Sequence, residues 1–185
     1  AAFGSEELGF KKAFQALLNF ADHESLDLCG RRIEITAPID MQAAVNNKTV
    51  FATRRVIRNG QFNVINGAAW TPTVVTSQAS YSSANPTTLT NVANVANVPV
   101  GALITGNGVG REVYVTAKNV GAQTLTLSNP LYGAPGTQSY TFTRFKYILD
   151  FSNFQQLDKM ILDDVELQCN GVARGVLLAP AGLTF

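Results

Sequence analysis

Apolar and polar residues alternate over short runs in two parts of the chain, residues 25–67 and 147–185. In the run 165–169, three apolar residues share one face and two polar residues share the other (Val165, Leu167 and Cys169 against Glu166 and Gln168). This is the period of a half-buried β-strand. Polar corners separate such runs, namely an Asp-Asp pair at 163–164 and Asn-Gly pairs at 59–60, 66–67 and 170–171. Short strands with a corner after each favour a chain that stacks coil upon coil, although Asn-Gly turns also suit a meander of hairpins.

Residues 5–22 are predicted to form an amphipathic helix. Ser5 can cap it, and Glu6 and Glu7 fall in the first turn, where the helix dipole favours negative charge. The apolar stripe of this helix consists of Phe10, Phe14, Leu17, Leu18 and Ala21. We expect the stripe to cover the end of the coils, and the alternative is that it binds a partner.

Residues 68–143 differ from the rest of the chain in composition. Between Thr71 and Phe142 there are three charged residues, Arg111, Glu112 and Lys118. Pro, Gly and Asn separate six strand-like runs: Thr73–Thr76, Thr88–Val92, Ala102–Thr105, Val113–Ala117, Thr124–Ser128 and Tyr140–Thr143. We therefore predict that a small antiparallel β barrel or sandwich interrupts the coils. Such an insertion either supplies binding loops or acts as a subunit-contact or spacer module.

The segments FKKAFQALLNFA, SLDLCGRRIEITAPI and RRVIRNGQFNVING resemble the opening of the pectate-lyase-like right-handed parallel β-helix proteins. Residues 57–60, Ile-Arg-Asn-Gly, fit the Ile-x-Asn-Gly coil motif of that superfamily, and the resemblance covers about residues 8–67 and 147–185. The superfamily includes polysaccharide lyases, glycoside hydrolases and many bacteriophage spike proteins. In addition, the run 98–128 resembles a small β module that recurs in phage tail and spike proteins.

We therefore predict an all-β fold, in which a right-handed parallel β-helix begins with a capping α-helix and carries an inserted antiparallel module. The expected parts are an N-terminal segment with the capping helix (1–24), first coils (25–67), the insertion (68–144) and resumed coils (145–185). We expect the coils to continue beyond residue 185, or a partner to cover their end.

Charge, apolar run length and residue spacing exclude several classes of partner and cofactor. The net charge is +1, charged residues make up 15% of the chain, and there is no basic stripe, so nucleic acid is not an expected partner. No apolar run approaches the roughly 18 residues of a membrane span. Cys29 and Cys169 are expected to be two buried free thiols rather than a disulfide. No zinc or calcium spacing is present, so no metal or other cofactor is expected.

Two groups of residues are candidates for chemistry. Asp163, Asp164 and Glu166 are the densest acidic cluster, and glycoside hydrolysis needs two carboxyl groups about 5 to 9.5 Å apart. The same three residues also suit a turn and an outward-facing strand position. As candidate sugar-stacking rings we take the exposed aromatics expected in or beside the insertion: Trp70, Tyr81 and Tyr132. Each of these rings can instead serve in packing.

The resemblance implies a virion spike or fibre protein of a phage or phage-like particle, made in the host cytoplasm and carried on the particle. It would bind host cell-surface polysaccharide, assemble as a homotrimer and contact other virion proteins. One alternative is a polysaccharide-degrading enzyme, a lyase or a glycoside hydrolase. The other is a structural adaptor that docks onto other virion proteins.

Overall fold

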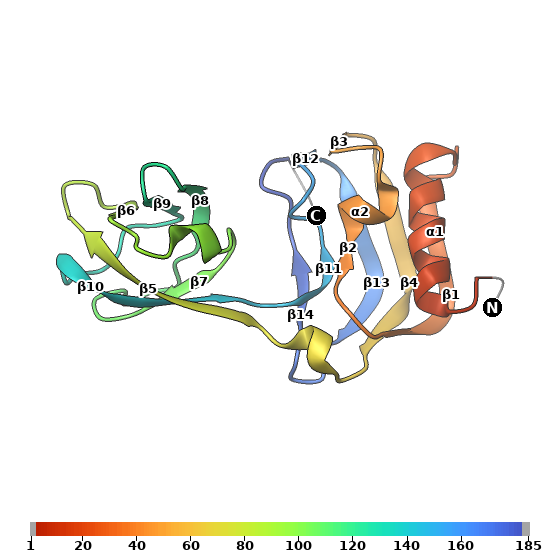
Figure 1. The fold of residues 1–185 in the computed structure, drawn as a ribbon. Coiled ribbons are helices and arrows are strands. Elements are labelled where there is room, and N and C mark those ends of the chain that lie inside the picture. Colours follow the sequence, from red (N-terminus) through yellow and green to blue (C-terminus); the bar gives the residue numbers. More distant parts are fainter. Residues whose placement is uncertain (1–2, 183–185) are drawn as a thin grey trace. The chain divides into compact units, whose positions relative to one another are not determined.

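The computed structural model describes residues 3–182, and the chain divides into two compact units (Figure 1). Unit 1 comprises residues up to Thr71 together with those from Lys146 onward, and unit 2 comprises Pro72–Phe145. Each unit has its own cluster of buried apolar side chains.

Unit 1 begins with helix α1 (Glu6–Asn19), where Ser5 accepts a hydrogen bond from the Leu8 N–H at 3.1 Å. The predicted helix is therefore confirmed, although it ends three residues earlier than expected. Phe10, Phe14, Leu17 and Leu18 are buried on one side of it. The Phe10 ring meets the Phe62 ring edge-on at 4.8 Å, so the apolar stripe of α1 packs on the core of its own unit.

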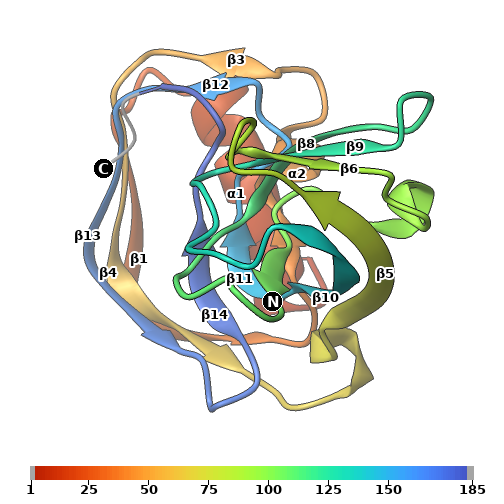
Figure 2. The ribbon, with the colours of Figure 1, turned by 90° about the vertical axis from the view of Figure 1, so that its left-hand side faces the viewer.

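Three small parallel sheets surround this core (Figures 1 and 2). The longest has the order β1-β4-β13, formed by Ser25–Ile35, Arg55–Val64 and Met160–Gln168. The second has the order β14-β11-β2, formed by Arg174–Leu177, Tyr147–Asp150 and Ile39–Asp40. The third pairs β12 (Gln156–Leu157) with β3 (Val50–Phe51). A short helix, α2 (Met41–Val45), and a 3-10 turn, η1 (Ala68–Trp70), complete the unit.

Unit 2 is built on one antiparallel sheet of six strands with the order β7-β10-β5-β6-β9-β8. The strands are β5 (Thr73–Tyr81), β6 (Thr88–Thr90), β7 (Leu103–Thr105), β8 (Val115–Asn119), β9 (Thr124–Leu127) and β10 (Gly136–Arg144). A 3-10 turn, η2, spans Val95–Asn97. Each of the six predicted strand-like runs overlaps one of these strands. An isolated antiparallel bridge between Leu103 and Tyr114 joins the two edges of the sheet locally, with backbone hydrogen bonds from Ile104 to Val113 and from Val115 to Ala102 at 2.9 Å each. The edge strands β7 and β8 do not pair as a ladder, so the sheet order remains open.

The predicted parallel β-helix is wrong. The sheets are small, they are parallel in unit 1 and antiparallel in unit 2, and none of them is closed or continues as a solenoid within the described residues. The reason lies in two of the predicted corners. Asn59-Gly60 lies inside β4 and Asp163-Asp164 lies inside β13, where Asn59 and Asp164 adopt left-handed φ angles of 57° and 51°. These pairs therefore bend long strands locally instead of ending short ones.

Candidate functional site

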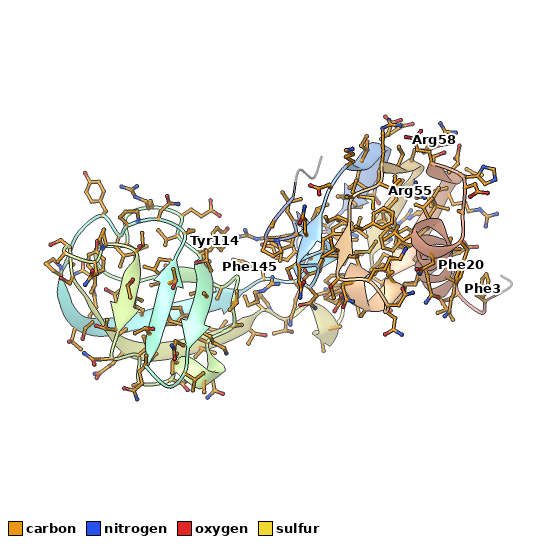
Figure 3. The ribbon with its side chains drawn as sticks, turned by 90° about the horizontal axis from the view of Figure 1, so that it is seen from above. Phe3, Phe20, Arg55, Arg58, Tyr114 and Phe145 are labelled. Atoms are coloured by element: carbon orange, nitrogen blue, oxygen red, sulfur yellow. The ribbon has the colours of Figure 1, made fainter. Side chains whose placement is uncertain are left out.

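The outer surface of the sheet β1-β4-β13 carries a polar face. Its side chains lie in register across the three strands, in rows of Asp27, Arg58 and Asp163, then Arg32, Gln61 and Glu166, then Glu34, Asn63 and Gln168. Asn63 is covered, with 4% exposure, and accepts a hydrogen bond from Asn170 at 3.1 Å. In the first row, Arg58 Nε lies 3.2 Å from Asp27 Oδ2, and Figure 3 labels Arg58. Four carboxylates and one amide of the polar face lie on its two edge strands, β1 and β13. The polar face contains no aromatic ring.

Glu166 is one of the three residues of the acidic cluster predicted from the sequence. Its carboxylate accepts hydrogen bonds from the side-chain amides of Gln61 and, at 2.8 Å, Gln168. These bonds, that from Gln61 first, hold the pKa of Glu166 below its usual value. Asp163 lies outward on the same strand, and Asp164 occupies the left-handed bend between them. Because a general acid in glycoside hydrolysis needs a raised pKa, Glu166 suits the role of an ionised acceptor but not that of a proton donor.

A polar groove of about 520 Å³ adjoins this face at the N-terminal end of α1. Its lining includes Arg32, Glu34 and Glu7. The Glu7 carboxylate pairs with Lys11 at 2.6 Å and accepts hydrogen bonds from the N–H and hydroxyl of Thr36 at 3.0 and 3.1 Å. The Glu7 carboxylate is thus engaged in bonds within the protein, and its bonds to Thr36 connect α1 to the end of β1.

Two of the three predicted sugar-stacking aromatics are buried. Trp70 is 2% exposed and its Nε1–H donates to the Ile65 carbonyl at 3.0 Å. Tyr81 is 6% exposed and its hydroxyl donates to the Leu131 carbonyl at 3.1 Å. The expectation of exposed rings is therefore wrong for both, because each side chain finds a polar partner inside the fold. Tyr132, by contrast, is 77% exposed.

Tyr132 stands beside a groove of about 420 Å³ in unit 2, which we call the Tyr132 groove. It is lined by the end of β7 and the segment that follows, including Ile104, Gly106, Val109, Gly110, Arg111 and Glu112. Tyr132 adjoins it through Gly110, because a Cβ atom on Gly110 would be 2.6 Å from the Tyr132 Cβ. Gly110 also has a φ angle of +64°, which favours glycine.

Backbone hydrogen bonds fix the position of Tyr132. Its own N–H donates to the Val109 carbonyl at 3.2 Å, and the next N–H, of Gly133, donates to Gly108 at 2.8 Å. The preceding residue, Leu131, is buried and accepts the hydrogen bond from Tyr81 described above. The exposed ring therefore lies on a loop whose backbone is held by hydrogen bonds at Tyr132 and at its two neighbours. Little backbone entropy is then lost when the ring contacts a ligand.

The floor of the groove is supported from the sheet beneath it. The side-chain amide of Gln138 donates to the Asn107 carbonyl at 3.0 Å and to the Tyr140 hydroxyl at 2.8 Å. Burial raises the pKa of the Tyr140 phenol above its usual value, so it remains a neutral partner. Gly106 packs directly on this ring, since a Cβ atom there would be 2.8 Å from Tyr140 Cδ1.

Both cysteines are free thiols, as predicted, but only Cys169 is partly buried and Cys29 is exposed. Burial raises the pKa of the Cys169 thiol. Among residues 3–182, no group of three or more His, Cys, Asp or Glu side chains could hold a metal ion. In the same part of the chain, no helix is long and apolar enough to cross a membrane.

No motif in the sequence marks Gly110, Arg111 or Glu112 as site residues. A signal was present, because Arg111 and Glu112 are two of the three charged residues between Thr71 and Phe142.

No protein-family model matches the chain, and no curated protein matches it in sequence.

Proposed function

We propose that this protein binds a polysaccharide and that a sugar ring stacks on Tyr132 beside the Tyr132 groove. The observation that carries the proposal is the 77% exposure of a tyrosine ring whose loop is held by backbone hydrogen bonds on both sides. A large apolar ring kept in water on a rigid loop contributes nothing to the core of unit 2. It is the kind of side chain that supplies contact area at low entropic cost when a ligand binds.

The groove supplies the polar partners that a sugar requires. Arg111 offers guanidinium donors and Glu112 offers a carboxylate acceptor, both on the wall of the groove next to Gly110. An aromatic platform for the apolar face of a sugar ring and charged groups for its hydroxyls together form a small carbohydrate site.

We further propose that the protein is a spike or fibre subunit of a phage or phage-like particle and that the polysaccharide lies on the host cell surface. The support for this is the sequence resemblance of residues 98–128, which include the lining of the Tyr132 groove, to a small β module of phage tail and spike proteins. We propose a homotrimer as part of the same spike hypothesis, and native mass spectrometry of the purified protein would test it.

The test of the binding function is calorimetric titration of the purified chain with a panel of bacterial surface polysaccharides. We expect at least one to bind, Tyr132→Ala to weaken it about tenfold, or about 1.4 kcal/mol, and Tyr132→Phe to retain most of the affinity. Val74→Ala is the matched control, because Val74 is also an exposed apolar residue of unit 2 (59%).

Two results would overturn the proposal. If no polysaccharide binds, the function is wrong. If a polysaccharide binds the Tyr132→Ala variant as tightly as it binds the wild type, the proposed site is wrong. The variant Glu166→Gln would then test the polar face of unit 1 as the binding site. Release of new reducing ends during the titration would instead favour the enzymatic alternative.

A further inference from the structure

The Tyr132 groove carries a cationic and an anionic side chain on consecutive residues, Arg111 and Glu112. The Glu112 carboxylate accepts a hydrogen bond from the Tyr114 hydroxyl (Figure 3 labels Tyr114). Both side chains are exposed. Arg111 forms no hydrogen bond or ion pair with any residue that the structure describes.

The other two charged residues of unit 2 are occupied elsewhere. Lys118 Nζ donates to the carbonyls of Ala96 and Val98 at 2.8 and 2.9 Å. Arg144 Nε donates to the Val100 carbonyl at 3.2 Å. Arg111 and Glu112 are the two charged residues of unit 2 that line the groove. The net charge of the pair is zero.

A pair of opposite charges at one wall selects against net charge in a ligand. An anionic group that approaches Arg111 is attracted by the guanidinium and repelled by the neighbouring Glu112 carboxylate. A cationic group is attracted by Glu112 and repelled by Arg111, so attraction and repulsion largely offset each other in both cases. Neighbouring hydroxyls on a sugar ring match the pair instead. One hydroxyl oxygen can accept from the guanidinium while the adjacent hydroxyl donates to the carboxylate, and both bonds are charge-assisted.

Tyr114 strengthens this arrangement as a positioning residue. Its hydroxyl donates to one oxygen of Glu112, and a carboxylate has about four acceptor positions in total. The bond can therefore orient the Glu112 carboxylate at the wall of the groove. Tyr114 is only partly exposed and is linked to Leu103 by a backbone bridge, so it is part of the sheet frame.

We infer that the Tyr132 groove recognises a neutral polysaccharide through a vicinal pair of hydroxyls, which bridge Arg111 and Glu112 while the sugar ring stacks on Tyr132. This inference rests on the proposed polysaccharide binding and goes further, because it names the chemical class of the ligand.

The experiment compares three forms of each neutral polysaccharide in a set of mannan, dextran and galactan. One form is untreated. The second is oxidised with periodate and reduced with borohydride, which cleaves vicinal diols and leaves a neutral chain. The third is carboxymethylated. We expect an untreated form to bind, its periodate-treated form to bind at least about tenfold more weakly, and carboxymethylation not to improve affinity. Affinity should change less than about twofold between about 50 and about 500 mM salt, because a neutral ligand carries no charge whose attraction salt could screen.

The variants Arg111→Gln and Glu112→Gln should each weaken binding of the untreated form about tenfold. Asp22→Asn, which removes an exposed charge from unit 1, is the control and should have no effect. Tighter binding of the carboxymethylated form, or tighter binding of the untreated form by Glu112→Gln, would overturn the inference. The proposed function would stand in either case, provided that binding still depended on Tyr132. Binding that survives periodate treatment would also overturn the inference. The absence of binding by every form, together with failure of the bacterial polysaccharide panel, would overturn both.

Discussion

Leu28 lies directly over Gly60. A Cβ atom added to Gly60 would be 2.6 Å from the Leu28 Cβ and 3.2 Å from the Arg31 carbonyl oxygen. The contact joins β1 to β4 at the point where their register shifts between Asp27 and Arg31. The glycine therefore permits two neighbouring strands to bend together without losing the buried leucine between them.

Gly60→Ala should destabilise unit 1 by about 1–3 kcal/mol, because the extra methyl group forces Leu28 or the backbone to move. Urea unfolding followed by the fluorescence of Trp70 measures this, since Trp70 is the single tryptophan and is buried in unit 1. Gly67→Ala is the control, because no atom lies within 4 Å of a Cβ there and its backbone is extended. Equal stability of the two variants would contradict the role assigned to the Leu28 contact.

Phe10→Ala should cost unit 1 about 3–5 kcal/mol, because Phe10 is 3% exposed and its ring packs edge-on against Phe62. Phe20→Ala should change the free energy of unfolding by less than about 0.5 kcal/mol, because the Phe20 side chain is 81% exposed. The same urea experiment compares the two variants. A large effect at Phe20 would show that its ring is covered in solution, which would revive the hypothesis of a partner-binding helix.

Asp27 should contribute stability that depends on pH. A hydrogen bond from the Cys29 N–H at 2.8 Å, with further help from Asn59 and Arg58, lowers the pKa of the Asp27 carboxyl below its usual value. The folded state therefore favours the ionised form, and the resulting stability is present above about pH 4 and lost as the pH falls through the lowered pKa.

The measurement is the difference in unfolding free energy between the wild type and Asp27→Asn. This difference should shrink as the pH falls from about 5 to about 3. Glu166 and Glu7, whose pKa values are also lowered, are present in both proteins and cancel in the comparison. A difference that stays constant over this range would show that Asp27 does not act through its ionised carboxylate.

Gly110→Ala should weaken polysaccharide binding at least about tenfold, because the new methyl group displaces Tyr132 and the left-handed backbone disfavours alanine by about 1–2 kcal/mol. Gly133→Ala, next to Tyr132 in sequence, should bind normally, because nothing lies within 4 Å of a Cβ there. Calorimetry on both variants, with circular dichroism to confirm folding, separates these effects. Normal binding by Gly110→Ala would mean that the ligand does not depend on the position of the Tyr132 ring.

Local patterns were sufficient to predict α1 and the strands of unit 2. The stripe from Phe10 to Leu18 has helical spacing, and the predicted run Thr73–Thr76 overlaps β5. The structure extends β5 to Tyr81, and Ser77, Ala79 and Tyr81 share its buried face. The burial of Trp70 had no comparable signal, because it depends on a hydrogen bond to Ile65 at the end of a parallel strand.

The parallel sheets of unit 1 were not predictable in the same way. Their pairings join residues that are distant in sequence, as when Gln61 in β4 faces Glu166 in β13. The left-handed backbone of Asn59 and Asp164 looks, in the sequence, like the end of a strand, and only the neighbouring strands show that the strand continues. The Tyr132 groove likewise depends on the contact of two loops at Gly110 and Tyr132, which no single stretch of sequence contains.

The first and last strand residues of unit 2 form one cross-strand pair, because Thr73 at the start of β5 pairs with Arg144 at the end of β10. Once that pair has formed, the entropic cost of joining β4 to β11 is that of a short connection, because a folded insertion no longer counts as free loop length. An insertion closed in this way can be lengthened, exchanged or lost while the strands on either side keep their partners. The surface loops of unit 2 can therefore vary in length and sequence, while unit 1 remains under the constraints of its own core.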